Sequence, residues 1–255
     1  MKYKITFIGS GNVAWNLAHA LDMDGHMILR VLSRNADHAK ELASKFGSYH
    51  GIIDNQSLSD SDIVFVSIND DAYDEVISNL NIPPQVMVCH TSGPIPLEVL
   101  EPYAQDVGVF YPLQSLNKNR IKDFRDVPLL IEASNASTEK KLYALADRIS
   151  NKVSITSSES RMKYHLAAVF ANNFTNLMYS LAQDYLESNN LEFDLLKPII
   201  YETALKLRDD LPKNLQTGPA KRNDLKVLEK HKAMLKDGLQ LEVYEHLSQI
   251  LMTLQ

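Results

Sequence analysis

A glycine-rich turn near the start of the sequence has the residue types and spacing of a phosphate-binding loop. The segment GSGNVA, which begins at Gly9, follows a short apolar run and opens a helical pattern, and it fits G-x-G-x-x-G/A. Gly9 permits the tight turn, Gly11 lets the backbone approach a pyrophosphate, and the small Ala14 allows close helix–strand packing. We expect the N–H groups of Asn12 and Val13 to face the phosphate. A tight turn without a ligand is the structural alternative, and the context favours dinucleotide binding.

The choice of dinucleotide is read about 20 residues beyond the glycines, where an NAD site usually places Asp or Glu. This chain has Ser33, Arg34 and Asn35 there, with no acidic residue among them. A hydroxyl and a guanidinium suit a 2′-phosphate, and arginine also offers a planar face to adenine. Asn35 or Ser33 could instead cap the following helix, and both roles can hold together. The sequence predicts NADP rather than NAD as the cofactor.

Polar residues follow two further predicted strands, at the sheet edge where ligands of open α/β sheets bind. Asn69 follows one strand, and Thr91, Ser92 and Gly93 follow the next. Asn69 could contact the cofactor's ribose or nicotinamide, or cap a helix. The other three could offer hydroxyl and N–H groups near the reacting carbon, or form a turn. We favour cofactor contact for all four.

The first long helix of the C-terminal half carries an imidazole and several amides on one side. His165, Asn172 and Asn176 are spaced by seven and then four residues, within about 20° of one line on an α-helix, and Asn173 flanks them. We expect His165 to act as general acid/base, because an imidazole titrates near neutral pH, and Asn172 and Asn173 to orient the substrate. A satisfied polar seam or a solvated face is the alternative. Lys163 lies on nearly the opposite side.

A polar loop at residues 217–224 leads into a later helix and carries Arg222. This arginine could clamp a substrate carboxylate in a fork geometry that lysine cannot reproduce, whereas Asp224 or Asn223 is a plausible helix cap. We expect His165 and Arg222 to converge on the mouth of the nucleotide site, with either group able to come from a partner subunit.

Two regions of different periodicity position these residues. Short apolar runs alternate with helical patterns up to about residue 156, which predicts a Rossmann-type parallel sheet domain over residues 1–156. Residues 157–255 contain no convincing strand and predict an all-helical domain for substrate binding and dimerisation. The expected elements are strands at 5–8, 27–32, 63–66, 86–89, 107–110, 128–131 and 153–155, and later helices at 159–188, 194–210, 223–236 and 239–254.

Composition narrows the class of protein. The chain has 255 residues, 45% hydrophobic and 23% charged, with a net charge of −6. The negative charge and the lack of a basic cluster argue against nucleic-acid binding. A single cysteine, Cys89, favours a reducing compartment, and no apolar run is long enough for a membrane span. We therefore expect a cytoplasmic protein without a metal site, because no metal-ligand spacing is present.

The first long helix also carries many apolar residues for a domain of its size. It includes Phe170, Phe174, Leu177, Met178 and Leu181. Burying such stripes around more than one axis is easier in a two-fold dimer, so we predict a homodimer built mainly from residues after 157.

Five segments carry a family resemblance over nearly the whole chain. They are IGSGNVAWNLA at 8–18, HTSG at 90–93, YPLQSL at 111–116, YHLAAVFANNF at 164–174 and TGPAKRNDLKVLEKH at 217–231. The chain resembles NADP oxidoreductases that pair a Rossmann-like domain with a helical C-terminal domain of unknown function, within the wider superfamily of 6-phosphogluconate dehydrogenase, pyrroline-5-carboxylate reductase and deazaflavin-dependent NADP reductases. The resemblance implies NADP binding, a helix-mediated homodimer and a cleft between the domains, and it supplies no substrate.

The resemblance also has one informative departure. Hydroxyacid dehydrogenases of the superfamily use a lysine followed closely by an asparagine, whereas Lys163 has no asparagine on its own face. The expected function is therefore an NADP-dependent oxidoreductase that transfers hydride between nicotinamide and an unidentified small carbonyl, imine or hydroxyl compound in the interdomain cleft. The alternative is a catalytically silent NADP-binding sensor or interaction protein.

Overall fold

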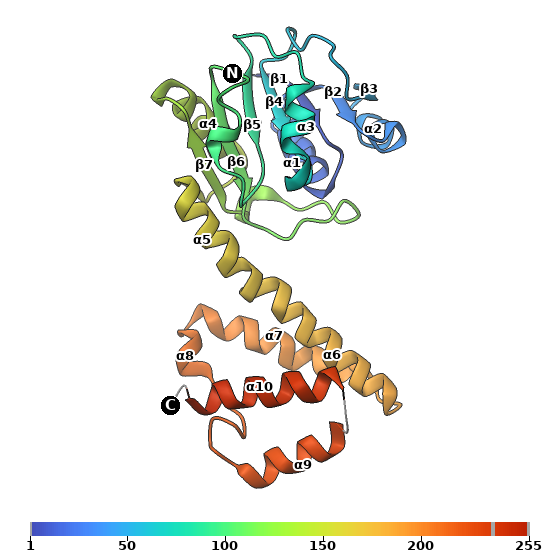
Figure 1. Cartoon of the computed structure of the whole chain (residues 1–255), viewed down its shortest axis with the longest axis vertical. Helices are drawn as coiled ribbons and strands as arrows, with labels where there is room; N and C mark the ends of the chain where they lie inside the picture. The colour runs from blue at the N-terminus through green and yellow to red at the C-terminus, as the bar shows by residue number, and fades with distance from the viewer. Residues whose placement is uncertain (1, 236–237, 254–255) are drawn as a thin grey trace. The chain divides into compact units, whose positions relative to one another are not determined.

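The computed structural model describes residues 2–235 and 238–253 and divides into two compact units, residues 1–173 and 174–255 (Figure 1). Within the described residues, no helix is long and apolar enough to cross a membrane. The domain border expected at 156/157 stays a prediction, because the compact units divide inside the long helical segment that follows the last strand.

The first unit is built on an eight-stranded sheet of order β3-β2-β1-β4-β5-β6-β7-β8. The strands are β1 (Lys4–Ile8), β2 (Met27–Ser33), β3 (Tyr49–Ile52), β4 (Ile63–Val66), β5 (Met87–His90), β6 (Val107–Pro112), β7 (Leu129–Ala133) and β8 (Val153–Ile155). Strands β1 to β6 are parallel to one another, which confirms a Rossmann-type sheet.

One edge of the sheet departs from the parallel arrangement of the other strands. Strand β7 pairs antiparallel with β6, and β8 then pairs parallel with β7. A parallel return needs a crossover, usually a helix. The connection between β6 and β7 contains only the short 3-10 helix Phe124–Asp126, so the chain turns back beside β6.

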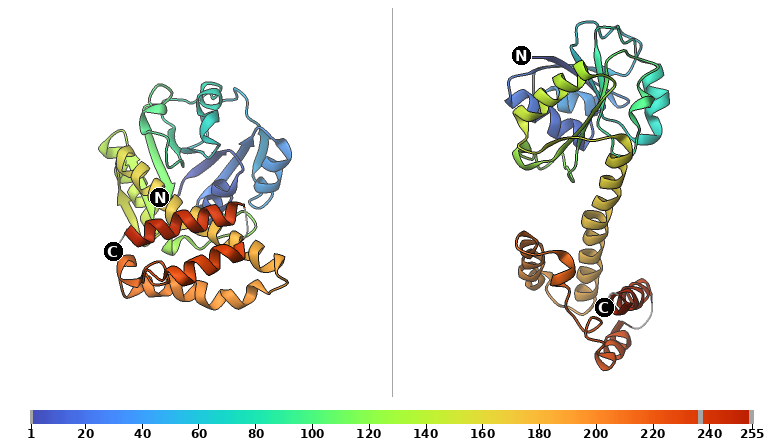
Figure 2. Two further views of the ribbon diagram at one scale, coloured as in Figure 1. Left: turned by 60° about the horizontal axis from the view of Figure 1, so that its bottom comes forward. Right: turned by 90° about the vertical axis from the view of Figure 1, so that its left-hand side faces the viewer.

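Helices cover both faces of the sheet, as Figures 1 and 2 show. Alternate residues of β1 point to opposite sides: Phe7 packs in a cluster with Leu17, whereas Ile8 packs in a second cluster with Val76. The first face carries α1 (Asn12–Met23), α2 (Ala36–Ala43) and α4 (Ala136–Ile149), and the second carries α3 (Tyr73–Ser78). Burial on both faces explains why β4 is apolar at every position.

A π-helical segment interrupts the helix expected at 159–188. The regular parts are α5 (Ser158–Ala168) and α6 (Thr175–Ser188), and residues Val169–Phe174 between them form the π-helix. The expected burial of this helix is not found within one chain, because Leu166 and Leu177 are both exposed.

The second unit consists of helices joined by turns and loops, and its described residues include no strand (Figure 2). Besides α6 it contains α7 (Lys197–Leu205), α8 (Pro212–Leu215), α9 (Leu225–Leu235) and α10 (Leu239–Thr253). The expected helix ends at 236 and 254 lie outside the described residues. Contacts such as that between His231 Nδ1 and the Tyr244 hydroxyl, 2.8 Å apart, join α9 to α10.

Candidate active site

The glycine turn between β1 and α1 has the geometry of an anion cradle. Gly9 has a φ of +106°, and a Cβ there would lie 2.1 Å from the carbonyl oxygen of Ser67, so only glycine fits. A Cβ on Gly11 would meet nothing within 4 Å, and Gly11 caps α1 without a side chain. The first N–H groups of α1, those of Asn12 and Val13, have no partner within the helix and no capping side chain from Gly11, which suits an anion such as a pyrophosphate.

The end of β2 has the residues expected at the ribose end of a dinucleotide. Ser33 is buried, and Asn35 caps α2 by accepting a hydrogen bond from a backbone N–H, so the capping role predicted for Asn35 is confirmed. Arg34 is exposed and lines a cavity of about 170 Å³ together with Asp54 and Glu75. Together with the glycine turn, these residues fit a nicotinamide dinucleotide.

The residues after β4 and β5 bond to one another along the carboxyl edge of the sheet. The Thr91 hydroxyl donates to Ser67 Oγ at 3.0 Å, and the Ser92 hydroxyl donates to the Asp70 carboxylate at 2.7 Å. Asn69 is exposed, and its side chain makes no capping hydrogen bond, so helix capping by this side chain is not observed. Ser67 also lies against Gly9, so these bonded residues form a row that runs from the glycine turn along the carboxyl edge of the sheet.

A tyrosine–histidine pair lies at the end of this row. The Tyr111 hydroxyl, at the carboxyl end of β6, is 3.0 Å from Nδ1 of the half-buried His165 on α5. A Cβ on Gly93 would lie 2.5 Å from that nitrogen and 3.0 Å from Tyr111 Cζ, so the glycine leaves room for the pair. Burial raises the pKa of Tyr111, although the charge of Arg161 opposes this shift. The phenol is therefore protonated at neutral pH and can donate a proton.

A buried arginine fixes the position of α5 against this turn. Arg161 lies one helical turn before His165 and is 1% exposed. Its Nε donates to the carbonyl oxygen of Gly93 at 3.2 Å, its Nη2 donates to that of Ile95 at 2.5 Å, and its Nη1 pairs with the Glu132 carboxylate. Glu132 in turn accepts hydrogen bonds from the backbone N–H and the hydroxyl of Ser158 at the start of α5.

A cavity of about 350 Å³ opens beside the tyrosine–histidine pair. Its lining includes Tyr111, His165, Asn172 and Asn173, and all of its lining residues belong to the first unit. The structure thus brings together three of the four residues predicted to be catalytic. Asn176, the third residue on the predicted line, does not line it. The wider i→i+5 turns of the π-helix rotate the chain less per residue than an α-helix, and this changes which amides share a side with His165.

The loop after β6 connects this cavity to α1, which follows the glycine turn. Gln114 and Ser115 of the loop line the cavity. Further along, the backbone N–H of Lys118 donates to Asn12 Oδ1 at 2.9 Å, and that of Lys122 donates to an α1 asparagine, Asn16, at 2.8 Å. The segment beside the cavity is thus bonded to α1, the helix that follows the glycine turn.

Arg222 lies in the second unit, exposed, in the turn before α9. Asp224 caps this helix, because its carboxylate accepts from the N–H of Val227 at 3.3 Å. The convergence of Arg222 with His165 and the interdomain cleft stay predictions.

Sequence reasoning did not single out Tyr111 or Arg161. Tyr111 begins the YPLQSL segment at a strand end, and this position was the signal that could have identified it. Arg161 gave no such signal, because its burial depends on Glu132, which lies 29 residues earlier in the chain.

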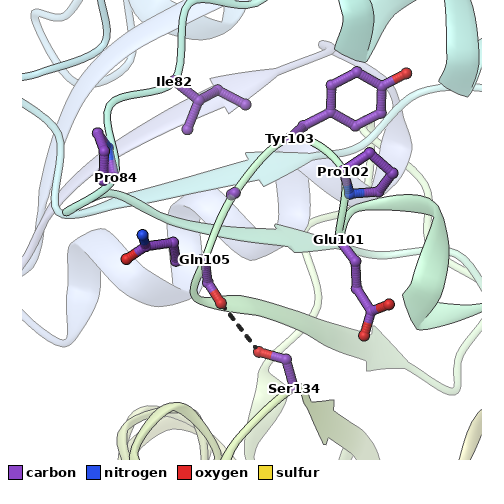
Figure 3. Close-up of a pocket in the computed structure, with 8 residues that line it drawn as sticks. Ile82, Pro84, Glu101, Pro102, Tyr103, Gln105 and Ser134 are labelled. Atoms are coloured by element: carbon purple, nitrogen blue, oxygen red, sulfur yellow. Dashed lines mark hydrogen bonds between the residues drawn. The ribbon is translucent and has the colours of Figure 1, made fainter.

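A second cavity, of about 460 Å³, lies at the opposite edge of the sheet (Figure 3). Its residues precede β5 and β6 or follow the reversed strand β7, as the hydrogen bond from Ser134 Oγ to the carbonyl oxygen of Gln105 illustrates. Parallel strands place nucleotide sites at their carboxyl ends, so this cavity is separate from the candidate site.

Comparison with known proteins agrees with this arrangement. A family model described as NADP oxidoreductase, coenzyme F420-dependent, matches residues 4–92, and one described as a domain of unknown function, DUF2520, matches residues 127–250. A crystal structure of a provisionally named NADP oxidoreductase from Bacteroides fragilis is 39% identical, with a TM-score of 0.93 over 99% of this chain and 98% of that chain.

More distant proteins share the fold or part of the sequence. A reductive aminase from Aspergillus terreus, in complex with NADPH and ethyl-5-oxohexanoate, is 14% identical, with a TM-score of 0.71 over 98% of this chain and 93% of that chain. A glutamyl-tRNA reductase from Sulfolobus acidocaldarius is 23% identical over 85% of this chain and 49% of its own length. The chain thus spans about half the length of that curated relative.

Proposed function

The chain belongs to the family of NADP oxidoreductases that includes the Bacteroides fragilis protein, and we propose that it is an NADP-dependent reductase of a small carbonyl or imine compound. The observation that carries the proposal is the hydrogen bond between Tyr111 and His165 over Gly93, at the sheet edge where the row from the phosphate turn ends. A proton donor at this edge is what a hydride acceptor requires.

The chemistry divides between the cofactor and the chain. When bound, the nicotinamide ring supplies the hydride that reduces the substrate carbon. Tyr111 donates its phenolic proton to the substrate oxygen or nitrogen as the C=O or C=N bond becomes single. His165, protonated at Nδ1, then returns a proton to the Tyr111 oxygen, and solvent reprotonates the imidazole. The amides of Asn172 and Asn173 orient the substrate in the cavity.

NADP is the favoured cofactor because of the residues at the end of β2. Positions 33–35 have no acid to hold a ribose 2′-hydroxyl, and the exposed Arg34 can bond a 2′-phosphate. Ser33 and Asn35 are held by the turn itself, so Arg34 provides the discrimination.

An open cavity beside the pair favours catalysis over the sensor alternative. A silent binding protein has no need of space next to a proton donor, whereas about 350 Å³ lies beside Tyr111 and His165. This volume is within the range of small-molecule sites.

The functional form is a homodimer through the C-terminal helices. Large apolar side chains of the second unit are exposed in the single chain, among them Leu195, Ile199 and Leu211, at 77%, 63% and 69%. Solvated apolar surface of this kind is buried most simply against a second copy about a two-fold axis. Light scattering at micromolar concentration should give twice the chain mass, and a monomeric mass would contradict this assembly.

The reductase function is tested by Tyr111→Phe, which removes only the donor hydroxyl. Oxidation of NADPH, followed by its absorbance with a panel of small ketones, aldehydes and imines, should fall by about 10²–10⁴-fold in this variant. NADPH binding by calorimetry should not change. Tyr103→Phe, in the opposite cavity, is the matched control and should keep full activity. Equal rates for both variants would refute the role of Tyr111.

A further inference from the structure

The cavity beside Tyr111 and His165 has a distinctive lining chemistry. Its polar side chains are the amides of Gln114, Asn172 and Asn173, the hydroxyl groups of Tyr111 and Ser115, and the imidazole of His165. None of its lining residues is Lys, Arg, Asp or Glu, and Tyr111 and His165 are the only ones that titrate.

The buried cation next to this cavity, Arg161, already has hydrogen-bond partners of its own. Arg161 bonds Glu132 and the carbonyl oxygens of Gly93 and Ile95, and it is not among the lining residues. A substrate carboxylate in this cavity would meet no fixed positive charge among the lining residues, so the first unit offers it no charged partner to offset any hydration it loses.

Amide side chains suit a different kind of ligand. Each Asn or Gln offers both a donor and an acceptor, so it can bond carbonyl, hydroxyl and amide groups. The π-helix turns the two neighbouring amides of Asn172 and Asn173 toward one cavity, and their side chains bond each other at 3.4 Å. π-helical turns of this kind are frequent at functional sites.

We propose that the substrate is a small uncharged carbonyl or imine compound bearing an amide or hydroxyl group, and that Asn172, Asn173 and Gln114 recognise that group. This inference rests on the proposed reductase function and specifies its substrate class. It differs from the carboxylate clamp expected of Arg222, and a matched pair of ligands decides between the two.

The test compares 5-oxohexanamide with 5-oxohexanoate, which have the same ketone and differ in one terminal group. Binding to the full-length protein with NADP⁺ present is measured by calorimetry, and NADPH oxidation is measured separately. The amide should bind about tenfold more tightly than the acid or better. Asn172→Asp should remove most of this affinity, and Asn176→Asp, on the same helical segment but outside the cavity lining, should leave it unchanged.

The possible results separate the substrate class from the function. Tighter binding of the acid, lost in Arg222→Ala, would overturn the uncharged substrate and leave the reductase function standing. Failure of both ligands to bind would overturn the substrate class as well. Preferred binding of the amide with no NADPH oxidation would support the recognition chemistry and count against the reductase function.

Discussion

Replacement of the buried Arg161 by methionine should destabilise the first unit by about 3–5 kcal/mol, the usual cost of removing one partner of a buried ion pair. The side chain of Arg161 is 1% exposed and that of its partner Glu132 is 17% exposed, so the charge left behind remains largely shielded from water. Methionine has a similar length and leaves little empty space, so the loss comes mainly from polar groups.

The expected magnitude agrees with the bonds that are broken. The carbonyl oxygens of Gly93 and Ile95 each lose a donor, at about 1 kcal/mol apiece. Glu132 keeps two bonds to Ser158, at 2.8 and 2.6 Å, but its negative charge becomes unpaired. An unpaired charge that cannot reach water accounts for the remainder.

The chain offers a matched control in Arg148, which also pairs with a carboxylate. It bonds Asp24 through Nε at 2.5 Å and Nη2 at 2.9 Å, yet its side chain is 50% exposed. Arg148→Met should therefore cost clearly less than Arg161→Met, because the exposed guanidinium is screened by water and Asp24 keeps its contact with His26 at 3.0 Å.

The assay is urea unfolding followed by the fluorescence of Trp15, the single tryptophan, which lies in the core of the first unit. A double variant, Arg161→Met with Glu132→Met, should recover most of the loss, because it leaves no unpaired charge. Equal losses for Arg161→Met and Arg148→Met, or a double variant no more stable than Arg161→Met, would refute the reasoning.

Three further predictions test the cofactor end, the close contact and the buried histidine. Arg34→Ala should weaken NADPH binding by about 10–100-fold in calorimetry and leave NADH binding unchanged, because it removes a charged hydrogen bond to the 2′-phosphate; equal losses for both would contradict it. Gly93→Ala should displace His165 or Tyr111 and lower kcat/KM about tenfold or more, and unchanged turnover would contradict the contact. Burial lowers the pKa of His90 from 6.5 to about 3. As the pH falls below 6.5, the unfolded chain therefore takes up a proton that the folded chain does not, and the free energy of unfolding decreases. The loss at pH 5 should be about 2 kcal/mol in Trp15-monitored unfolding and largely absent in His90→Asn.

Much of the first unit could be predicted from the sequence because its signals are local. The glycine turn and the apolar run of β4 depend on neighbouring residues alone. The short strand β3, with the sequence YHGI, has no continuous apolar run, and the sequence pattern therefore did not predict it as a strand. The direction of β7 could not be read either, because an apolar strand has the same pattern in both orientations.

The candidate site shows where periodicity stops being informative. Counting 100° per residue places His165, Asn172 and Asn176 on one line, whereas the π-helix at Val169–Phe174 brings Asn173 rather than Asn176 to the cavity. A π-helical turn contains about one residue more than an α-helical turn, and no characteristic residue composition marks it in a sequence. Tyr111 was equally hidden, because its partner His165 lies 54 residues away in the chain.

One short segment, residues 91–95, joins the proposed cofactor site to the proposed proton donor. Thr91 bonds Ser67, whose carbonyl oxygen lies where a Cβ on Gly9 would be, and the carbonyl oxygens of Gly93 and Ile95 are held by Arg161. A shift of this segment would therefore move the floor of the phosphate turn and the Tyr111 pair together. Hydride transfer requires the two ends to be aligned to within a fraction of an ångström, and a rigid segment bonded to both provides that alignment before any ligand arrives. Under the proposed function, the buried charge of Arg161 thus holds the segment whose rigidity this alignment would require.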